Sequence, residues 1–237
     1  MNNTDSIPKN SSKKLNRTLE ANNSCSVTPL QRFEISMKIG FEEWHDGIGY
    51  DIEAIRIASQ AERDAIEQIL INHSPRDWRD IEALAEINTR CARETIKEAM
   101  KNPDPVVRVA VTRFAPDLVT DNERTQSVID ALHNTEIFGG LSQVLAEVER
   151  YHPEEVKEAL IKELLNRKGD VAAVFAAILF YLFGEAEEPF DMKQRPFFLR
   201  FNTEDRKERV EVFREACQKL KISPEKYLHR KQEFSKK

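Results

Sequence analysis

The chain has 237 residues, of which 41 are acidic and 36 are basic, and its formal net charge is −5. Charged residues make up 32% of the sequence and only 7 residues are glycine, which excludes a loop-rich or β-sandwich protein. The longest apolar run, at 171–183, is too short to span a bilayer, so no membrane partner is expected.

The charge is distributed unevenly along the chain. Residues 34–205 carry 34 acids and 20 bases, a net of −14, whereas 206–237 carry 11 bases and 5 acids. Residues 1–33 are also basic, with 5 bases and 2 acids. Phosphate contacts supply most non-specific affinity for DNA, so an acidic body does not suit a duplex-binding groove. The charge pattern favours a basic protein partner over a nucleic acid.

The three cysteines, Cys25, Cys91 and Cys217, form no CxxC motif. Cys91 and Cys217 fall on apolar helix stripes, which predicts buried free thiols and fits a reducing cytoplasm. The N-terminal sequence contains no apolar segment of the kind found in secretory signals. We therefore expect a cytoplasmic protein, and no motif calls for a cofactor.

The segment 1–32 is rich in Asn, Ser, Thr and Lys and poor in large apolar residues, which predicts a disordered tail. A helical domain is then expected over 33–222, followed by a short helix and a basic tail over 223–237.

The stretch EEWHDGIGYD (42–51) gathers acids, aromatic residues and glycines just before the first predicted helix. Asp51 is expected to cap that helix. A metal site at His45 is an alternative, although adjacent residues rarely converge on one ion and the five histidines are scattered. The stretch is interpreted as an entry loop, with Trp44 and His45 as candidate partner contacts.

Capping signals divide the following residues into helices. SQAE (59–62) has the spacing of a capping box and predicts a helix through about Asn72. SPRD (74–77) predicts the next start, with Pro75 in the first turn, where it loses no hydrogen bond. Thr89 is expected to cap the helix after that.

Further pairs of helices follow at similar spacing. Candidate caps and starts are Asp104 with Pro105, Asp121, Pro153 and Asp170, the last opening the apolar helix 171–183. The predicted pair starts are Ser74, Asp104, Thr135 and Asp170, spaced by 30, 31 and 35 residues. Paired amphipathic helices at such a period are typical of an all-α solenoid of antiparallel helix pairs.

The helix at 171–183 is apolar nearly all round, so other segments are expected to cover it on several sides. RPFFLRFN (195–202) is predicted to be an extended stretch that seals this helix, with a grip on a partner as the alternative. Asn202 or Thr203 is then expected to cap a closing helix. A C-terminal capping helix of this kind is what a solenoid requires.

One segment carries a resemblance to a known repeat. NPDPVVRVAVTRFA (102–115) resembles the consensus of a HEAT-type repeat, in which a proline-containing turn precedes D-x-x-V-R-x-x-A. Asp104, Val107 and Arg108 match, while Ala110 stands one place short of the usual alanine. The resemblance covers about residues 74–184 and implies a HEAT-like α-solenoid in which the Asp and Arg link neighbouring repeats.

RDWRD (76–80) is the candidate catalytic segment. A class of DNA glycosylases with HEAT-like repeats uses Trp, Asp and Arg around an extruded base, which gives Trp78 and Asp80 possible roles. Those enzymes need a basic groove for the DNA backbone, and the acidic body does not suit one. No GxSxG, HExxH, Walker or dinucleotide-binding motif is present. A non-catalytic protein is the preferred interpretation, with the glycosylase as the alternative.

The blocks WHDGIGYD, DWRD and RPFFLRFN are similar to those of HEAT-repeat immunity proteins of bacterial polymorphic toxin systems. This resemblance implies a protein that neutralises a basic toxin domain by binding it; a general protein-interaction scaffold is the alternative. The candidate contacts on the first full helix pair are Glu82, Glu86, Glu94 and Glu98.

Overall fold

The structure, a computed structural model, describes residues 27–38, 47–137 and 139–228. In these ranges every regular element is a helix and strands are absent, so the predicted all-helical class is confirmed. The first elements are α1 (Pro29–Met37), α3 (Ile52–Ile57), α4 (Gln60–Asn72), α5 (Trp78–Ile87), α6 (Arg90–Ala99), α7 (Pro105–Phe114) and η1 (Pro116–Leu118). The remaining elements are α8 (Asp121–Asn134), α9 (Leu141–Arg150), α10 (Glu154–Asn166), α11 (Gly169–Leu182), α12 (Arg195–Phe198), η2 (Leu199–Phe201), α13 (Arg206–Lys219) and α14 (Glu225–Leu228).

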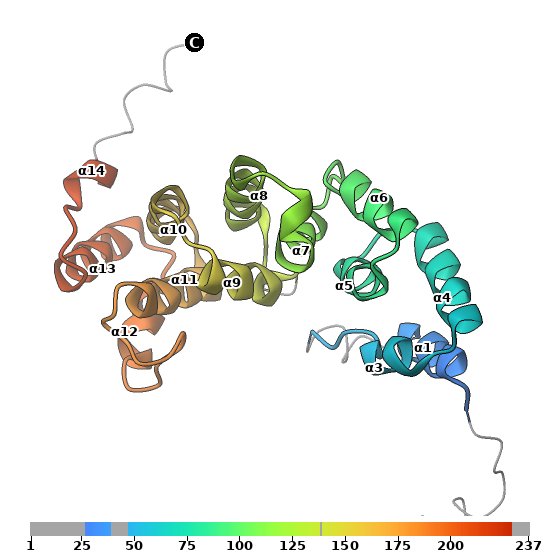
Figure 1. Ribbon diagram of the computed structural model, residues 1–237. Coiled ribbons are helices and arrows are strands. Elements are labelled where there is room, and N and C mark those ends of the chain that lie inside the picture. The colour runs from blue at the N-terminus through green and yellow to red at the C-terminus, as the bar shows by residue number, and fades with distance from the viewer. Residues whose placement is uncertain (1–26, 39–46, 138, 229–237) are drawn as a thin grey trace, which may run out of the picture.

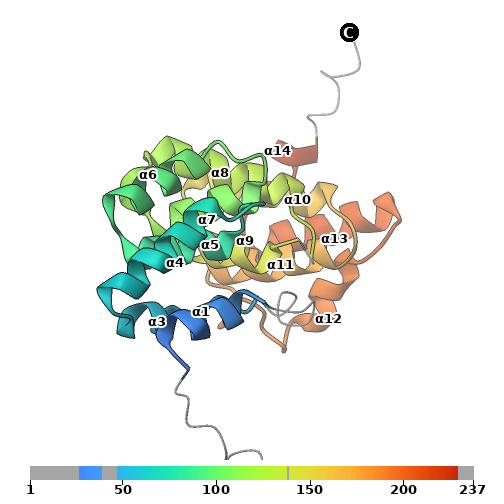
Figure 2. The ribbon, with the colours of Figure 1, turned by 90° about the vertical axis from the view of Figure 1, so that its right-hand side faces the viewer.

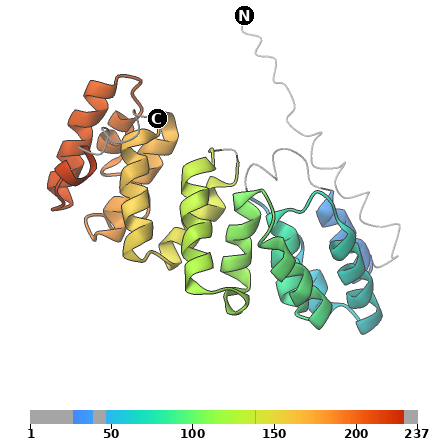
Figure 3. The same cartoon turned by 90° about the horizontal axis from the view of Figure 1, so that it is seen from above.

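The helices follow one another across the molecule in chain order. Figure 1 shows α4, α6, α8 and α10 along the outer side of the molecule, with α4 at the right and the other three along the upper edge, and α5, α7, α9 and α11 on the inner side, below or beside them. The view from above (Figure 3) shows the same order from the N-terminal to the C-terminal end. We call these two sets of four helices the upper row and the lower row.

Side-chain caps fix several helix starts at the predicted residues. Asp51, Thr89 and Asp104 each accept a hydrogen bond from a first-turn backbone N–H, in α3, α6 and α7 respectively. Ser59 forms the predicted capping box with Glu62 at the start of α4, which ends at Asn72 as expected. Each cap gives a partner to an N–H group that the first helical turn leaves unpaired.

Two predicted caps are wrong because a reciprocal capping box forms elsewhere. Ser74 does not cap α5. Asp77 caps it, and the Asp80 carboxylate accepts a hydrogen bond from the backbone N–H of Asp77. At α8 the cap is Thr120 rather than Asp121, because Thr120 and Glu123 satisfy each other's backbone N–H groups.

The later starts also differ from the prediction. Thr135 ends α8 instead of opening a helix, and α9 begins only at Leu141. Asp170 lies in the first turn of α11 and does not cap it, since α11 begins one residue earlier. Asp205 caps α13 in place of Asn202 or Thr203, because its carboxylate accepts the Lys207 N–H.

The N-terminal boundary of the folded part lies earlier than predicted. α1 begins at Pro29, inside the segment predicted as a tail, because Thr28 and Gln31 form a capping box. Phe33 of α1 is fully buried against the edge of the Tyr50 ring. The rest of the predicted tail, 1–26, and the C-terminal residues 229–237 lie outside the described residues.

Two clusters of buried apolar side chains form the interior, and they meet at α7. The first cluster draws on α1 to α7 and includes Val107, Ala110 and Val111. The second draws on α7 to α13 and takes Val109 from α7. Helix α7 packs against α5, α6, α8 and α9. Residues close together on this one helix are therefore buried in two different clusters.

The apolar helix α11 is covered as predicted. Phe175 and Leu179 have no exposed surface, and α10, α12 and η2 pack on the helix. RPFFLRFN forms α12 and η2, so it is helical and not extended, but its Phe198 and Phe201 are fully buried. Figures 1 and 2 show α12 at the underside of the C-terminal half.

The cysteine prediction is half right. Cys217 is buried, whereas Cys91 is exposed, because its neighbour Ala92 takes the inward position at the start of α6. Cys25 lies outside the described residues.

The two HEAT-motif residues, Asp104 and Arg108, make different kinds of contact. Asp104 caps its own helix, while Arg108 donates to the backbone oxygen of Asn102 at 2.6 Å and pairs with Asp130 of α8 at 3.3 Å.

Candidate functional site

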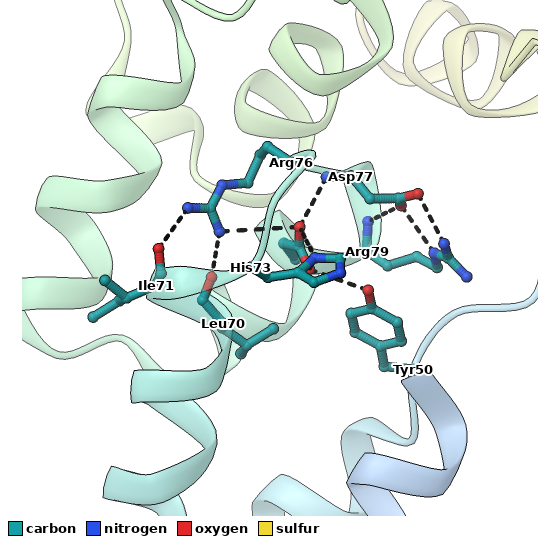
Figure 4. A network of polar contacts seen from close by, with 8 residues as sticks. Tyr50, Leu70, Ile71, His73, Arg76, Asp77 and Arg79 are labelled. Carbon is teal, nitrogen blue, oxygen red and sulfur yellow. Dashed lines mark hydrogen bonds and ion pairs between the residues drawn. The ribbon is translucent and has the colours of Figure 1, made fainter. Parts of the chain in front are cut away.

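The RDWRD segment and the end of the entry loop meet at a buried carboxylate, Asp80. Its side chain has no exposed surface. The Tyr50 hydroxyl donates to Asp80 Oδ1 at 3.1 Å, and His73 Nδ1 lies 2.9 Å from both Asp80 oxygens. The backbone N–H of Asp77 donates to Asp80 Oδ2 at 2.8 Å. Figure 4 shows these contacts converging from α5, from the segment after α4 and from the segment before α3.

Two arginines extend this network. Arg76 donates to the backbone oxygens of Leu70 and Ile71, the C-terminal carbonyls of α4, and lies 3.9 Å from Asp80. Arg79 forms a two-pronged pair with Asp77, at 2.9 and 2.8 Å. The network therefore joins the end of α4 to the start of α5.

Tyr50 connects the entry loop to this network through Asp80 and Arg79. The Arg79 guanidinium lies over the Tyr50 ring, 5.1 Å from its centroid. Burial raises the pKa of the Tyr50 hydroxyl above its ordinary value, and the negative Asp80 raises it further, so the hydroxyl stays a proton donor. We call the set of Tyr50, His73, Arg76, Asp77, Arg79 and Asp80 the Asp80 joint.

The chemistry available to the Asp80 joint is limited by enclosure. A general base must come within hydrogen-bonding reach of the proton that it removes. Asp80 is enclosed, and both of its oxygens already accept hydrogen bonds from the protein. The joint is therefore best explained as a structural connection between the entry loop, α4 and α5.

The four candidate partner contacts that the structure describes lie on two helices. Trp44 and His45 lie outside the described residues. Glu82 and Glu86 are on α5 in the lower row, whereas Glu94 and Glu98 are on α6 in the upper row (Figure 1).

The two glutamates of α5 lie in different surroundings. Glu86 accepts both prongs of the Arg56 guanidinium at 3.0 Å, and this bond lowers the pKa of Glu86. Burial raises the pKa of Glu82 despite the nearby Arg113. A Cβ at Gly49 would lie 2.9 Å from a Glu82 oxygen, so the loop backbone approaches this carboxylate closely.

The two glutamates of α6 line an open groove of about 810 Å³. The groove lies between α6 and α8, and Arg108 of α7 contributes to its lining. Three further carboxylates line it that sequence reasoning missed: Asp117, Glu123 and Asp130. Glu123 and Asp130 are seven residues apart, which places them on one face of α8, but the sequence does not say that this face meets α6. We call this feature the α6–α8 groove.

A second, smaller cavity of about 150 Å³ lies where α5, α7 and α9 begin. Its lining includes Trp78 and the capping residues Asp77, Asp104 and Gly140. Both aspartates are committed to backbone N–H groups, at 2.9 Å from Arg79 N and 2.8 Å from Val106 N.

Among the described residues, no group of three or more His, Cys, Asp and Glu side chains is arranged to hold a metal ion. None of the helices in the same residues has the length and apolar character needed to cross a membrane.

No protein-family model, curated protein or solved structure matches this chain.

Proposed function

We propose that this chain is a non-catalytic, HEAT-like solenoid that binds and neutralises a basic toxin domain in the cytoplasm, as HEAT-repeat immunity proteins do. The observation that carries the proposal is the open α6–α8 groove, whose lining holds five carboxylates and three basic side chains. A surface of this charge attracts a basic protein and speeds their encounter.

The arrangement of the helices supports the solenoid part of the proposal. Neighbours within the upper row, α4 with α6 and α8 with α10, pack on each other, as do α5 with α7 and α7 with α9 in the lower row. Stacked antiparallel pairs would present extended rows of polar side chains to a partner.

The buried position of Asp80 supports binding over base excision. A glycosylase that used Asp80 would need that carboxylate at an extruded base, and here the side chain is enclosed by Tyr50, His73 and the start of α5. A general scaffold remains the alternative within the binding class, and it differs by lacking a single cognate partner.

The test captures a partner from cells with the purified chain, identifies it by mass spectrometry, and measures its activity with and without the chain. We expect a tight complex that abolishes the toxin's activity, with an association rate that falls as salt rises from 50 to 500 mM. Release of bases from alkylated DNA by the chain alone, lost in Asp80→Asn, would overturn the proposal. Binding of several unrelated proteins with equal affinity would instead favour the scaffold.

A further inference from the structure

We infer that the α6–α8 groove is the docking surface for a basic, amphipathic helical segment of the partner. This inference rests on the proposed function and names the surface that performs it.

The groove lies at a break in the upper row. Helices α4 and α6 pack on each other, and so do α8 and α10, while α6 and α8 are each packed on α7 beneath them. The opening therefore lies above the helix where the two apolar clusters meet. A segment bound there contacts both halves of the molecule at once.

The rim of the groove is acidic and readily available. Glu94 and Glu98 have side chains 65% and 70% exposed, and each is paired with a still more exposed basic residue, Arg90 in α6 and Lys101 just after it. Exposed pairs of this kind contribute little stability. A lysine or arginine of the partner can replace Arg90 or Lys101 at little cost.

The opposite rim also carries paired carboxylates, but their basic partners are less exposed than the acids. Asp117 is 60% exposed and pairs with Arg93, and Asp130 is 50% exposed and pairs with Arg108. The Glu123 carboxylate accepts a hydrogen bond from the backbone N–H of Thr120, the residue that caps α8. This bond lowers the pKa of the Glu123 carboxyl and keeps it charged. Three basic side chains, Lys97, Lys101 and Arg108, also line the groove, so the lining has two more carboxylates than basic groups, and Arg90 and Arg93 pair with two of these carboxylates from outside the lining.

The floor of the groove contributes apolar contact. Met100, Leu118 and Val119 are half-buried and line it. Methionine adapts to differently shaped apolar side chains, and amphipathic helices bind with their apolar face in such grooves. An apolar floor between acidic rims fits a helix with an apolar stripe flanked by lysine or arginine.

The other candidate surfaces fit this occupant less well. Glu86 is held by two bonds from Arg56, and Glu82 lies against the backbone at Gly49. The cavity at Trp78 is smaller, at about 150 Å³.

The test uses a labelled 18-residue helical peptide with a leucine stripe flanked by lysines, bound to the full chain and followed by fluorescence anisotropy. A peptide with glutamate in place of every lysine, and an all-lysine peptide of equal charge, are the probe controls. We expect Glu94→Lys with Glu98→Lys to weaken binding of the lysine–leucine peptide at least ten-fold. The matched control is Glu149→Lys with Glu211→Lys, which makes the same charge change at exposed acids outside the groove and is expected to change affinity less than two-fold.

Leu118→Ser tests the floor separately. This substitution should lower the affinity for the lysine–leucine peptide. It should leave the affinity for the all-lysine peptide unchanged, because that peptide has no apolar side chains to contact the floor. An equal loss of affinity for the lysine–leucine peptide in the groove variant and in the matched control would overturn the inference. So would binding of the glutamate peptide as tightly as the lysine–leucine peptide. Competition by a peptide of residues 1–26 that equals the lysine–leucine peptide would overturn it in favour of the chain's own basic segment.

The same variants separate this inference from the proposed function. If a toxin domain binds both double variants with wild-type affinity, the groove is not its docking surface, and the proposed neutralisation is unaffected. If the peptide binds in the groove but no toxin is inhibited, the proposed neutralisation is wrong, and the groove is still a docking surface.

Discussion

At the scale of single residues, Asp80 shows how a charge is kept inside a small helical protein. An ionised carboxylate is costly to bury unless hydrogen bonds and opposite charges replace water. Here a tyrosine hydroxyl, a backbone N–H and His73 take those places, at 3.1, 2.8 and 2.9 Å. The entry loop, the end of α4 and the start of α5 thus depend on one side chain.

We expect Asp80→Ala to lower the free energy of unfolding by about 3–5 kcal/mol, because it leaves buried polar groups without their partner. Tyr50→Phe should cost about 1–3 kcal/mol, since one oxygen of Asp80 loses its donor. Urea unfolding followed by circular dichroism measures both. The control is Asp64→Ala, an exposed acid on α4, which should change stability little. Asp80→Ala as stable as that control would show that the joint is not structural.

A second residue-scale prediction concerns alkaline pH. Burial raises the pKa of the Cys217 thiol to about 12, and Glu225 adds to the effect. The thiol of the unfolded chain titrates near ~8.5. Because the folded pKa is the higher one, the contribution of Cys217 is complete below ~8.5 and is lost as the pH rises towards 12.

The wild type should therefore lose more stability between pH 7.5 and pH 10 than Cys217→Ala does, in urea unfolding under reducing conditions. The pKa of Tyr50 is also raised by burial, but both proteins keep this residue, so the difference between them isolates the thiol. Equal losses in the two proteins would contradict the assignment.

At the scale of elements, arginines bind backbone carbonyls at or shortly after the C-terminal ends of the four upper-row helices. Arg76 reaches the end of α4, Arg108 the turn after α6, Arg167 the end of α8, and Arg209 the residue that follows α10. The last carbonyls of a helix lack internal partners and carry partial negative charge, so a guanidinium satisfies both needs. These contacts tie each upper helix to an element that follows it in the chain.

Arg167 is the clearest member of this set to test. It donates to the backbone oxygens of His133 and Thr135, both at 2.7 Å, and its side chain is 14% exposed. We expect Arg167→Ala to cost about 1.5–3 kcal/mol, the range for hydrogen bonds to charged groups, and Arg167→Lys to restore only part of it. Arg195→Ala, at an exposed position of α12, is the control. If thermal unfolding shows no difference in stability between Arg167→Ala and Arg195→Ala, the bonds from Arg167 to the end of α8 do not stabilise the protein.

The cover over α11 gives a further element-scale prediction. Phe175→Ala should destabilise the protein by about 3–5 kcal/mol, because the side chain is fully enclosed and its loss leaves a cavity. Leu199→Ala, in η2 and 41% exposed, should cost far less. Urea unfolding of the two variants measures the contrast, and equal costs would show that α11 is not the centre of the second cluster.

The sequence predicts elements better than it predicts the connections between them. Helix starts at Asp51, Ser59, Thr89 and Asp104 depend on neighbouring residues, so local signals place them correctly. The prediction misses the start of α8 because Asp121 alone does not mark it; Thr120 and Glu123, which have the spacing of a capping box, do.

Long-range contacts explain what the sequence could not predict. Tyr50 is thirty residues from Asp80, and nothing local to either residue indicates that they meet. The α6–α8 groove joins Glu94 to Asp130 in the same way. Glu82 and Glu94 were grouped by their exposed, acidic helix faces, but those faces belong to different rows.

At the scale of the whole molecule, α7 divides the interior into two clusters. Val107 is 1% exposed and belongs to the N-terminal cluster, while Val109 is 0% exposed and belongs to the C-terminal one. The same substitution at these two positions, two residues apart, therefore perturbs different halves. Valine to alanine removes two methyl groups, so each change should cost about 1.5 kcal/mol before any cavity term.

Hydrogen exchange followed by mass spectrometry distinguishes the two halves, because local opening reports the stability of each region. We expect Val107→Ala to speed exchange mainly in α4, α5 and α6, and Val109→Ala to do so mainly in α8, α9 and α10. A peptide bound in the α6–α8 groove contacts both halves, so it should slow exchange on both sides of α7 at once. If both variants speed exchange equally everywhere, the two clusters unfold as one unit, and the groove spans no boundary between regions of independent stability.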